Sequence, residues 1–341
     1  MLTIESHVSL KPYNTFGIDV SARYWVEITK EEDLQTLLQL GDHVSTPKLI
    51  LGGGSNVLLC HDFDGLVVKM NIQGIEVVRE DADHIYLKAG AGVNWHELVL
   101  FCVQQGYAGM ENLSLIPGTV GAAPMQNIGA YGVELEQVFE SLSAVHIQTG
   151  EQRTFSHADC EFGYRESVFK RELRGQYIIT SVTFQLDKRP TFHTRYGAIQ
   201  ETLEAMGITE ETLSIQAISD AVINIRRSKL PDPAEIGNAG SFFKNPEISK
   251  NQFEALRVQY LSLPGYPVGD DMVKVPAGWL IEQAGWKGYR SGDVGVHARQ
   301  ALVLVNYGNA TGAQILALAR QIQESVLAKY GITITPEVNV V

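Results

Sequence analysis

LILGGGSNVLL, residues 49–59, places three consecutive glycines between two short apolar runs. The pattern predicts a buried strand, a tight turn at 52–54 and a second strand. Glycines allow positive φ angles, and because they lack a Cβ they let a ligand approach backbone N–H groups closely. Consecutive N–H groups in such a turn form a concave anion site, to which Ser55 and Asn56 would add side-chain donors. The stretch is therefore a candidate pyrophosphate-binding loop, with an ordinary hairpin turn as the alternative.

A second loop rich in small residues follows at 116–132, IPGTVGAAPMQNIGAYG, and contains no charge over seventeen positions. A neutral wall of glycine and alanine suits a flat, partly apolar ring system that backbone amides approach edge-on. The alternative is an ordinary buried loop. Two such loops in one half of the chain favour a large dinucleotide as the ligand.

Composition narrows the class of protein. The 341 residues suffice for two or three domains, and the net charge of −12 argues against nucleic acid and anionic membranes as partners. No apolar run approaches the ~20 residues of a membrane span, and the first ten residues lack the apolar centre of a signal peptide. Cys60, Cys102 and Cys160 are widely spaced without a C-x-x-C motif, which argues against a disulfide framework or zinc site and favours a reducing cytoplasm.

Helix and strand signals are mixed along the first half of the chain, with strands predominating, which predicts an α+β architecture. A capping box at 29–32 predicts a helix that Gly41 ends, and Asn94 caps a second helix that runs to 105 and ends at Gly106. We expect His96, in that helix's first turn, to be a surface or capping residue. The expected strands are 48–51, 65–68, 74–78, 85–89 and 177–186, with a hairpin over 142–154.

The second half begins near residues 187–190, DKRP, which form a plausible domain boundary. Apolar residues at helical spacing predict helices over 216–229, 249–260, 277–284 and 311–329. Strands are expected over 301–305 and 332–338.

Three short stretches carry polar residues that a fold alone does not need. In GYRES, 163–167, Arg165 could hold a carboxylate through two hydrogen bonds, or form a surface salt bridge with Glu161 or Glu166. In GSFFKNP, 240–246, Ser241 lacks the G-x-S-x-G context and the nearby histidine of a serine hydrolase, but a hydroxyl can deliver a proton to a carbanion. The alternative for that stretch is a plain turn. Glu337, near the end of the chain, becomes a candidate only if the last strand returns to the site.

Together these stretches resemble the UDP-N-acetylenolpyruvoylglucosamine reductase family, flavoenzymes of peptidoglycan precursor synthesis. Six motifs occur in the family's order, and the resemblance extends from about residue 14 to 337. They are GGGSN at 52–56, IPGTVG at 116–121, GAYG at 129–132, GYRES at 163–167, GSFFKNP at 240–246 and PEV at 336–338. The stretch TRYG at 194–197 is similar to the tyrosine loop of the family's type I subclass.

The resemblance implies an FAD-binding domain of the PCMH or vanillyl-alcohol-oxidase type over 14–187. An α+β substrate-binding domain over 188–341 would follow, with its last strand returning to the active site. It implies FAD and NADPH as cofactors and no metal. NADPH would reduce the flavin and leave, and the enolpyruvyl group of UDP-N-acetylenolpyruvoylglucosamine would then be reduced to give UDP-N-acetylmuramate.

The resemblance also implies roles for individual residues. Arg165 and Glu337 would polarise the substrate carboxylate, and Ser241 would protonate C2. The residues implied to bind the cofactor are Gly52, Gly53, Gly54, Ser55, Asn56, Val57, Pro117, Gly118, Thr119, Gly121, Ala122, Gly129, Tyr131 and Arg226. Those implied to bind the substrate are Tyr196, Lys229, Asn245, Tyr266, Lys274 and Gln300.

One position departs from the family pattern, because many relatives carry an arginine where this chain has Asn339. Two other functions stay open at the level of sequence. One is a flavin oxidase of the same superfamily, with His61 or Cys60 as a possible covalent tether to FAD. The other is a nucleotide-sugar binder without activity. We expect a cytoplasmic monomer whose partners are small molecules.

Overall fold

The strand expected before the glycine turn is present as β3 (Lys48–Leu51), and the short strand after it is β4 (Val57–Leu58). The structure, a computed structural model, describes residues 2–40 and 46–341. Its internal contacts divide the chain into two units. Unit 1 comprises Met1–Val8, Ala22–Gly54 and Phe63–Ser228, and unit 2 comprises Ser9–Ser21, Ser55–Asp62 and Lys229–Val341. The functional domain limits expected from the sequence, 14–187 and 188–341, stay a prediction.

The first sheet of unit 1 contains the strand that leads into the glycine turn. Its strand order is β1-β2-β5-β3, and both β2 and β3 run parallel to β5. Its members are β1 (Glu5–Ser9), β2 (Ser21–Ile28), β5 (Phe63–Met70) and β3. Since β2 and β3 are both parallel to β5, they are parallel to each other, and the chain must cross over between them. The helix α1 (Glu31–Gln39) lies in that connection.

The start of α1 differs from the sequence prediction. The N-cap residue is Lys30, which makes no side-chain capping bond, so the capping box expected at 29–32 is wrong. The helix begins one residue too late for the Thr29 hydroxyl to occupy the N-cap position. Gly41, expected to end this helix, lies outside the described residues.

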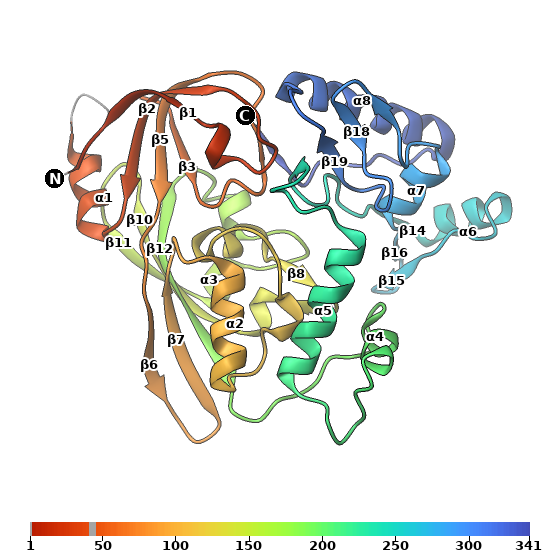
Figure 1. Cartoon of the computed structure of the whole chain (residues 1–341), viewed down its shortest axis with the longest axis horizontal. Helices are drawn as coiled ribbons and strands as arrows, with labels where there is room; N and C mark the ends of the chain where they lie inside the picture. The colour runs from red at the N-terminus through yellow and green to blue at the C-terminus, as the bar shows by residue number, and fades with distance from the viewer. Residues whose placement is uncertain (1, 41–45) are drawn as a thin grey trace. The chain divides into compact units, whose positions relative to one another are not determined.

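The second sheet of unit 1 is antiparallel, with the order β11-β10-β12-β7-β6. Figure 1 shows β6 and β7 as a long hairpin. The strands are β6 (Ile75–Glu80), β7 (His84–Gly90), β10 (Phe139–His146), β11 (Gln152–Ser156) and β12 (Tyr177–Asp187). The expected strands and the 142–154 hairpin are confirmed, and Gly150 has the positive φ (71°) that the turn requires.

The helix α2 (Trp95–Gln105) carries the best local signals in the chain, and its prediction is confirmed. The Asn94 side chain accepts hydrogen bonds from the first-turn N–H groups, and Gly106 ends the helix in the left-handed conformation. Its buried face, with Leu98 and Cys102, belongs to the same core as Phe184 of β12. Burying this face on the sheet fixes where the first turn of α2 lies.

The remaining helices and strands of unit 1 are short, apart from α5. They are α3 (His157–Cys160), α4 (Ile199–Ala205), α5 (Ile215–Lys229), β8 (Gly129–Ala130) and β9 (Val133–Glu134). The 3-10 turns in the described parts of the chain are Lys11–Tyr13, Glu111–Leu113, Val120–Gln126, Leu135–Gln137 and Val168–Lys170. Among the described residues, none of the helices is both long and apolar enough to span a bilayer.

Unit 2 has two small antiparallel sheets, ordered β13-β19-β18-β17 and β14-β16-β15. Their strands are β13 (Gly237–Asn238), β14 (Glu247–Ser249), β15 (Tyr266–Val268), β16 (Met272–Lys274), β17 (Arg290–Ser291), β18 (Val294–Val296) and β19 (Leu304–Asn306). The helices are α6 (Lys250–Gln259), α7 (Ala277–Gln283) and α8 (Gly312–Tyr330). All three confirm the predicted helices to within one residue at each end, and α8 opens with a capping box between Thr311 and Gln314.

Two predicted strands of unit 2 are wrong in extent. The strand expected over 301–305 is β19, which begins only at Leu304. The strand expected over 332–338 is reduced to an isolated bridge between Phe243 and Pro336. Alternating burial at Ile332 and Ile334 produced the strand-like pattern, although no neighbouring strand runs along this segment in the described chain. The actual strand, β20 (Asn339–Val340), follows it and pairs in parallel with β4.

We predict that Asn94→Ala lowers the free energy of unfolding by about 1 kcal/mol, because two first-turn N–H groups of α2 lose their acceptor. Urea unfolding followed by circular dichroism measures this. Lys30→Ala at the start of α1 is the matched control, since that N-cap makes no side-chain bond. An equal loss in both variants would contradict the capping role.

Candidate active site

The two glycine-rich loops meet within unit 1. A Cβ added to Gly53 would lie 2.8 Å from the Cα of Gly118, and one added to Gly52 would lie 2.5 Å from the Oγ1 of Thr119 and 3.4 Å from the Cβ of Ala122. Real Cβ atoms do not approach other atoms so closely, so residues 52 and 53 must lack side chains if the loops are to touch. The glycines that the sequence singled out therefore hold two distant stretches backbone to backbone.

The second loop is fixed at its base by main-chain hydrogen bonds. The N–H of Trp95 donates to the carbonyl of Gly118 at 3.0 Å, and the N–H of Gly121 donates to the carbonyl of Ala91 at 2.9 Å. A Cβ on Gly121 would lie 2.5 Å from the Cβ of Ala91. Pro117, just before the first of these contacts, is exposed. The loop thus combines a rigid base with an accessible tip.

Two polar groups lie at this junction: Thr119, which the family resemblance implied as a cofactor residue, and Lys69, which the sequence did not single out. The Oγ1 of Thr119 is buried and has no hydrogen-bond partner among the described residues. The ammonium of Lys69, on β5, donates to the carbonyl of Gly52 at 2.5 Å, and burial lowers its pKa. A cation beside a glycine cradle suits an anionic ligand, but one lysine in a strand carries no sequence signal of that role.

Arg165 sits at a tight turn in unit 1, where Gly163 and Glu166 form an isolated bridge. Its backbone is left-handed (φ 55°), which is uncommon outside glycine and concentrates at functional sites. The guanidinium donates from Nη2 to the carbonyl of Gly129 at 2.7 Å, and its Nη1 lies 3.9 Å from the Glu134 carboxylate. Glu161, one salt-bridge partner weighed from the sequence, instead pairs with Arg171 at 2.8 Å.

Tyr131 and Tyr196 lie on neighbouring stretches of unit 1. Tyr131 has a left-handed backbone (φ 51°), and a Cβ added to the next residue, Gly132, would lie 3.2 Å from the Cβ of Tyr196. Burial raises the pKa of the Tyr131 phenol, and the positive charge of Arg226 opposes this effect. Tyr196 is 58% exposed, so its ring is available to a ligand.

The helix α5 presents two candidate residues near its C-terminal end. Arg226 donates from Nε to the carbonyl of Leu115 at 3.1 Å, which ties α5 to the residue that precedes the second glycine loop. Burial lowers the pKa of the Arg226 guanidinium. Lys229, the last residue of α5, is exposed and belongs by its contacts to unit 2.

Ser241 and Glu337 come together within unit 2 although they lie far apart in the sequence. The N–H of Glu337 donates to the carbonyl of Phe242 at 2.8 Å, and the N–H of Lys244 donates to the carbonyl of Thr335 at 2.9 Å. Phe242 and Phe243 are buried in the unit 2 core and anchor this pairing, while Ser241 and Glu337 stay partly exposed. Asn56, in the first glycine stretch, reaches the same place, since its amide donates to the carbonyl of Glu337 at 3.4 Å.

The other candidate substrate residues of unit 2 are placed by turns and short strands. Tyr266 and Lys274 are direct cross-strand partners on β15 and β16. Lys274 forms an ion pair of 3.4 Å with Glu247 on β14. The amide oxygen of Asn245 accepts from the N–H of Ala277 at 2.9 Å at the start of α7, and that of Gln300 accepts from the N–H of Leu302 at 3.3 Å.

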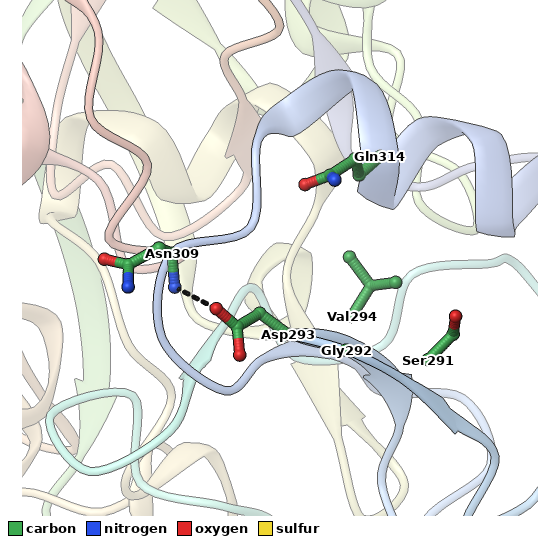
Figure 2. Close-up of a pocket in the computed structure, with 6 residues that line it drawn as sticks. All are labelled: Ser291, Gly292, Asp293, Val294, Asn309 and Gln314. Carbon is green, nitrogen blue, oxygen red and sulfur yellow. Dashed lines mark hydrogen bonds between the residues drawn. The ribbon is translucent and has the colours of Figure 1, made fainter.

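Unit 2 also has a surface pocket that contains none of the candidate residues (Figure 2). It is lined by Ser291, Gly292, Asp293, Val294, Asn309 and Gln314. Its polar groups are already used by the fold: the Asp293 carboxylate accepts from the N–H of Asn309 at 2.9 Å, and Gln314 belongs to the capping box of α8. We assign no ligand to it.

Sequence reasoning missed one residue beside the second loop, His96. It was expected to be a surface or capping residue, yet its Nδ1 accepts a hydrogen bond from the N–H of Leu115 at 2.9 Å. The only local signal was a histidine next to a tryptophan at the start of an apolar helix.

Comparison with known proteins gives the chain a family. Residues 22–156 match a family model described as an FAD binding domain, and residues 232–341 match one described as the C-terminal domain of UDP-N-acetylenolpyruvoylglucosamine reductase. A UDP-N-acetylenolpyruvoylglucosamine reductase of Amoebophilus asiaticus is 54% identical over 100% of both chains, and one of Pseudomonas putida is 52% identical over 98% of both. The crystal structure of UDP-N-acetylenolpyruvylglucosamine reductase (MurB) from Thermus caldophilus has the same fold, with a TM-score of 0.69, 24% identity and coverage of 100% of this chain and 99% of that one. The chain therefore belongs to the UDP-N-acetylenolpyruvoylglucosamine reductase family.

Proposed function

We propose that the chain uses NADPH to reduce the enolpyruvyl group of UDP-N-acetylenolpyruvoylglucosamine, giving UDP-N-acetylmuramate for peptidoglycan precursor synthesis. The observation that carries this proposal is the 54% identity to a reductase of that name along the full length of both chains. We also propose that the enzyme is a cytoplasmic monomer, which fractionation and light scattering on the purified protein would test.

FAD fits the junction of the two glycine loops. The backbone contact between Gly53 and Gly118 leaves N–H groups without side-chain cover, which suits a diphosphate. The Thr119 hydroxyl, which has no partner among the described residues, and the half-buried Lys69 ammonium supply a further donor and a positive charge at the same place. We propose that residues 52–57 and 117–122 hold the cofactor, with Gly129, Tyr131 and Arg226 beside its ring. FAD held there would supply the hydride-transfer chemistry between NADPH and C3 of the enolpyruvyl group.

The chain's own residues would manage the charge that develops as C3 accepts the hydride. We propose that Arg165 and Glu337 bind the substrate carboxylate and that Ser241 delivers a proton to C2. The short backbone link between Phe242 and Glu337 supports a joint role for Ser241 and Glu337. Preorganised charge at the place where negative charge develops lowers the barrier. Glu337 must be protonated, or balanced by Arg165, if it is not to repel that carboxylate.

The remaining candidates would bind the sugar nucleotide. We propose that Tyr196, Lys229 and Asn245 contact the diphosphate. Tyr266, Lys274 and Gln300 would contact the nucleotide end. The exposed rings of Tyr196 and Tyr266 and the position of Tyr266 directly opposite Lys274 support this assignment.

We predict that Gly53→Ala weakens FAD binding at least tenfold, because the added Cβ would lie 2.8 Å from a backbone atom of the opposing loop. Isothermal titration of the apoprotein with FAD measures the dissociation constant. Gly308→Ala is the control, since its Cβ would meet only the Asp293 carboxylate, at 3.3 Å. Unchanged FAD affinity in Gly53→Ala would contradict the role of the loop contact.

We predict that in the Ser241→Ala variant NADPH reduces the flavin at the wild-type rate. Reoxidation of the reduced flavin by the enolpyruvyl substrate should be ~10²–10⁴-fold slower, as expected for a lost general acid. Anaerobic stopped-flow absorbance separates the two half-reactions. Ser291→Ala, which removes a hydroxyl elsewhere in unit 2, should leave both rates unchanged. Equal slowing of both half-reactions in Ser241→Ala would refute the proton-donor role.

A further inference from the structure

Leu115, the residue before the second glycine loop, is held by side chains at both of its backbone polar groups. Its N–H donates to the Nδ1 of His96 at 2.9 Å, and its carbonyl accepts from the Nε of Arg226 at 3.1 Å. Leu115 has a left-handed backbone (φ 59°), which is unfavourable for a residue with a branched side chain. Such a conformation persists where the surroundings enforce it.

The first turn of α2 holds the loop on both sides. Besides the bond from His96 to Leu115, the indole Nε1 of Trp95 donates to the carbonyl of Leu113 at 3.0 Å. The backbone N–H of Trp95 donates to the carbonyl of Gly118, also at 3.0 Å. Since α2 is packed into the core of unit 1, these bonds tie the loop to a rigid element.

The helix α5 also forms hydrogen bonds to the segment from Leu113 to Leu115. The Ser219 hydroxyl lies 2.8 Å from that of Ser114, and both residues are buried. Arg226 is seven residues further along α5, on the same face of the helix, and reaches Leu115. The segment from Leu113 to Leu115 is thus bound by buried or half-buried polar groups of α2 and α5.

We propose that His96 is a positioning residue for FAD: its unprotonated Nδ1, together with Arg226, holds Leu115 in the left-handed conformation from which the loop 116–121 starts. Without the His96 acceptor, the loop would spend part of its time in other conformations. The apparent affinity for FAD would then fall in proportion to the fraction of molecules whose loop keeps the conformation that binds FAD. This inference rests on the proposed FAD binding by the same loop.

The contact requires a neutral imidazole, because a protonated Nδ1 would present a hydrogen to the Leu115 N–H. The charged groups near the ring are Arg226 and Arg227 on α5 and Glu97 on α2. Burial lowers the pKa of His96 below its usual 6.5, and the two arginines lower it further, while Glu97 opposes them. The contribution of the contact is therefore fully present above pH 6.5 and is lost as the pH falls through the lowered pKa of His96.

The test is the FAD dissociation constant of the apoprotein, measured by quenching of flavin fluorescence between pH 5 and 7.5. We expect wild-type affinity to fall toward pH 5. His96→Asn places an amide oxygen where Nδ1 lies and does not titrate, so it should bind FAD within about threefold of wild type at pH 7.5 and lose the pH dependence. His96→Leu should bind about tenfold more weakly or worse at pH 7.5, because the Leu115 N–H loses its acceptor.

The matched control is His146→Leu. His146 also accepts a backbone N–H through Nδ1, that of Thr149 at 3.2 Å, but in the β10–β11 hairpin, so its loss should leave FAD affinity unchanged. His96→Asn binding as weakly as His96→Leu, or His96→Asn losing affinity at low pH as the wild type does, would overturn the inference. If His96→Leu does not fold, the comparison of wild type with His96→Asn across pH decides the matter. Failure of the wild type to bind FAD at any pH would instead overturn the proposed function.

Discussion

The backbone of Gly53 lies so close to that of Gly118 that a Cβ at residue 53 would lie 2.8 Å from the Gly118 Cα. This approach joins the parallel sheet that supplies β3 to the helix α2 that mounts the second loop. The strand fixes one loop and the first turn of the helix fixes the other, and the glycine contact sets the spacing between them. Candidate cofactor residues from both loops depend on that spacing.

Most of the non-glycine residues with a left-handed backbone lie near the two glycine loops or Arg165. Of the six such residues in the described parts of the chain, Leu115, Asn127, Tyr131 and Arg165 all flank or belong to the proposed site. Each is tied by polar contacts, as when the Asn127 side chain accepts from the N–H of Glu136 at 3.0 Å. Backbone strain held by side-chain hydrogen bonds is a common way to keep a site preorganised, because loosening one bond releases the conformation.

Local signals made much of the fold predictable. The cap at Asn94 and the stop at Gly106 depend on residues a few positions apart, and the apolar periodicity over 311–329 is equally local; each gave a helix where the sequence placed it. The prediction of a strand over 332–338 was wrong because the alternation of apolar and polar residues there reflects burial beneath other elements. Whether a segment pairs with a neighbouring strand cannot be read from that segment alone. The contact of His96 with Leu115 was hidden for a similar reason: it joins residues nineteen positions apart and needs the tertiary structure to exist first.

The pairing of β20 with β4 has a consequence for biosynthesis. Asn339 donates from its side chain to the carbonyl of Asn56, 283 positions earlier in the chain. Residues after the first glycine turn therefore gain their partner only when almost three hundred further residues have left the ribosome. Contacts of such long sequence separation form late in folding. The segment after the first glycine stretch, although made early, therefore stays without its β20 partner until residues 339–340 have been made.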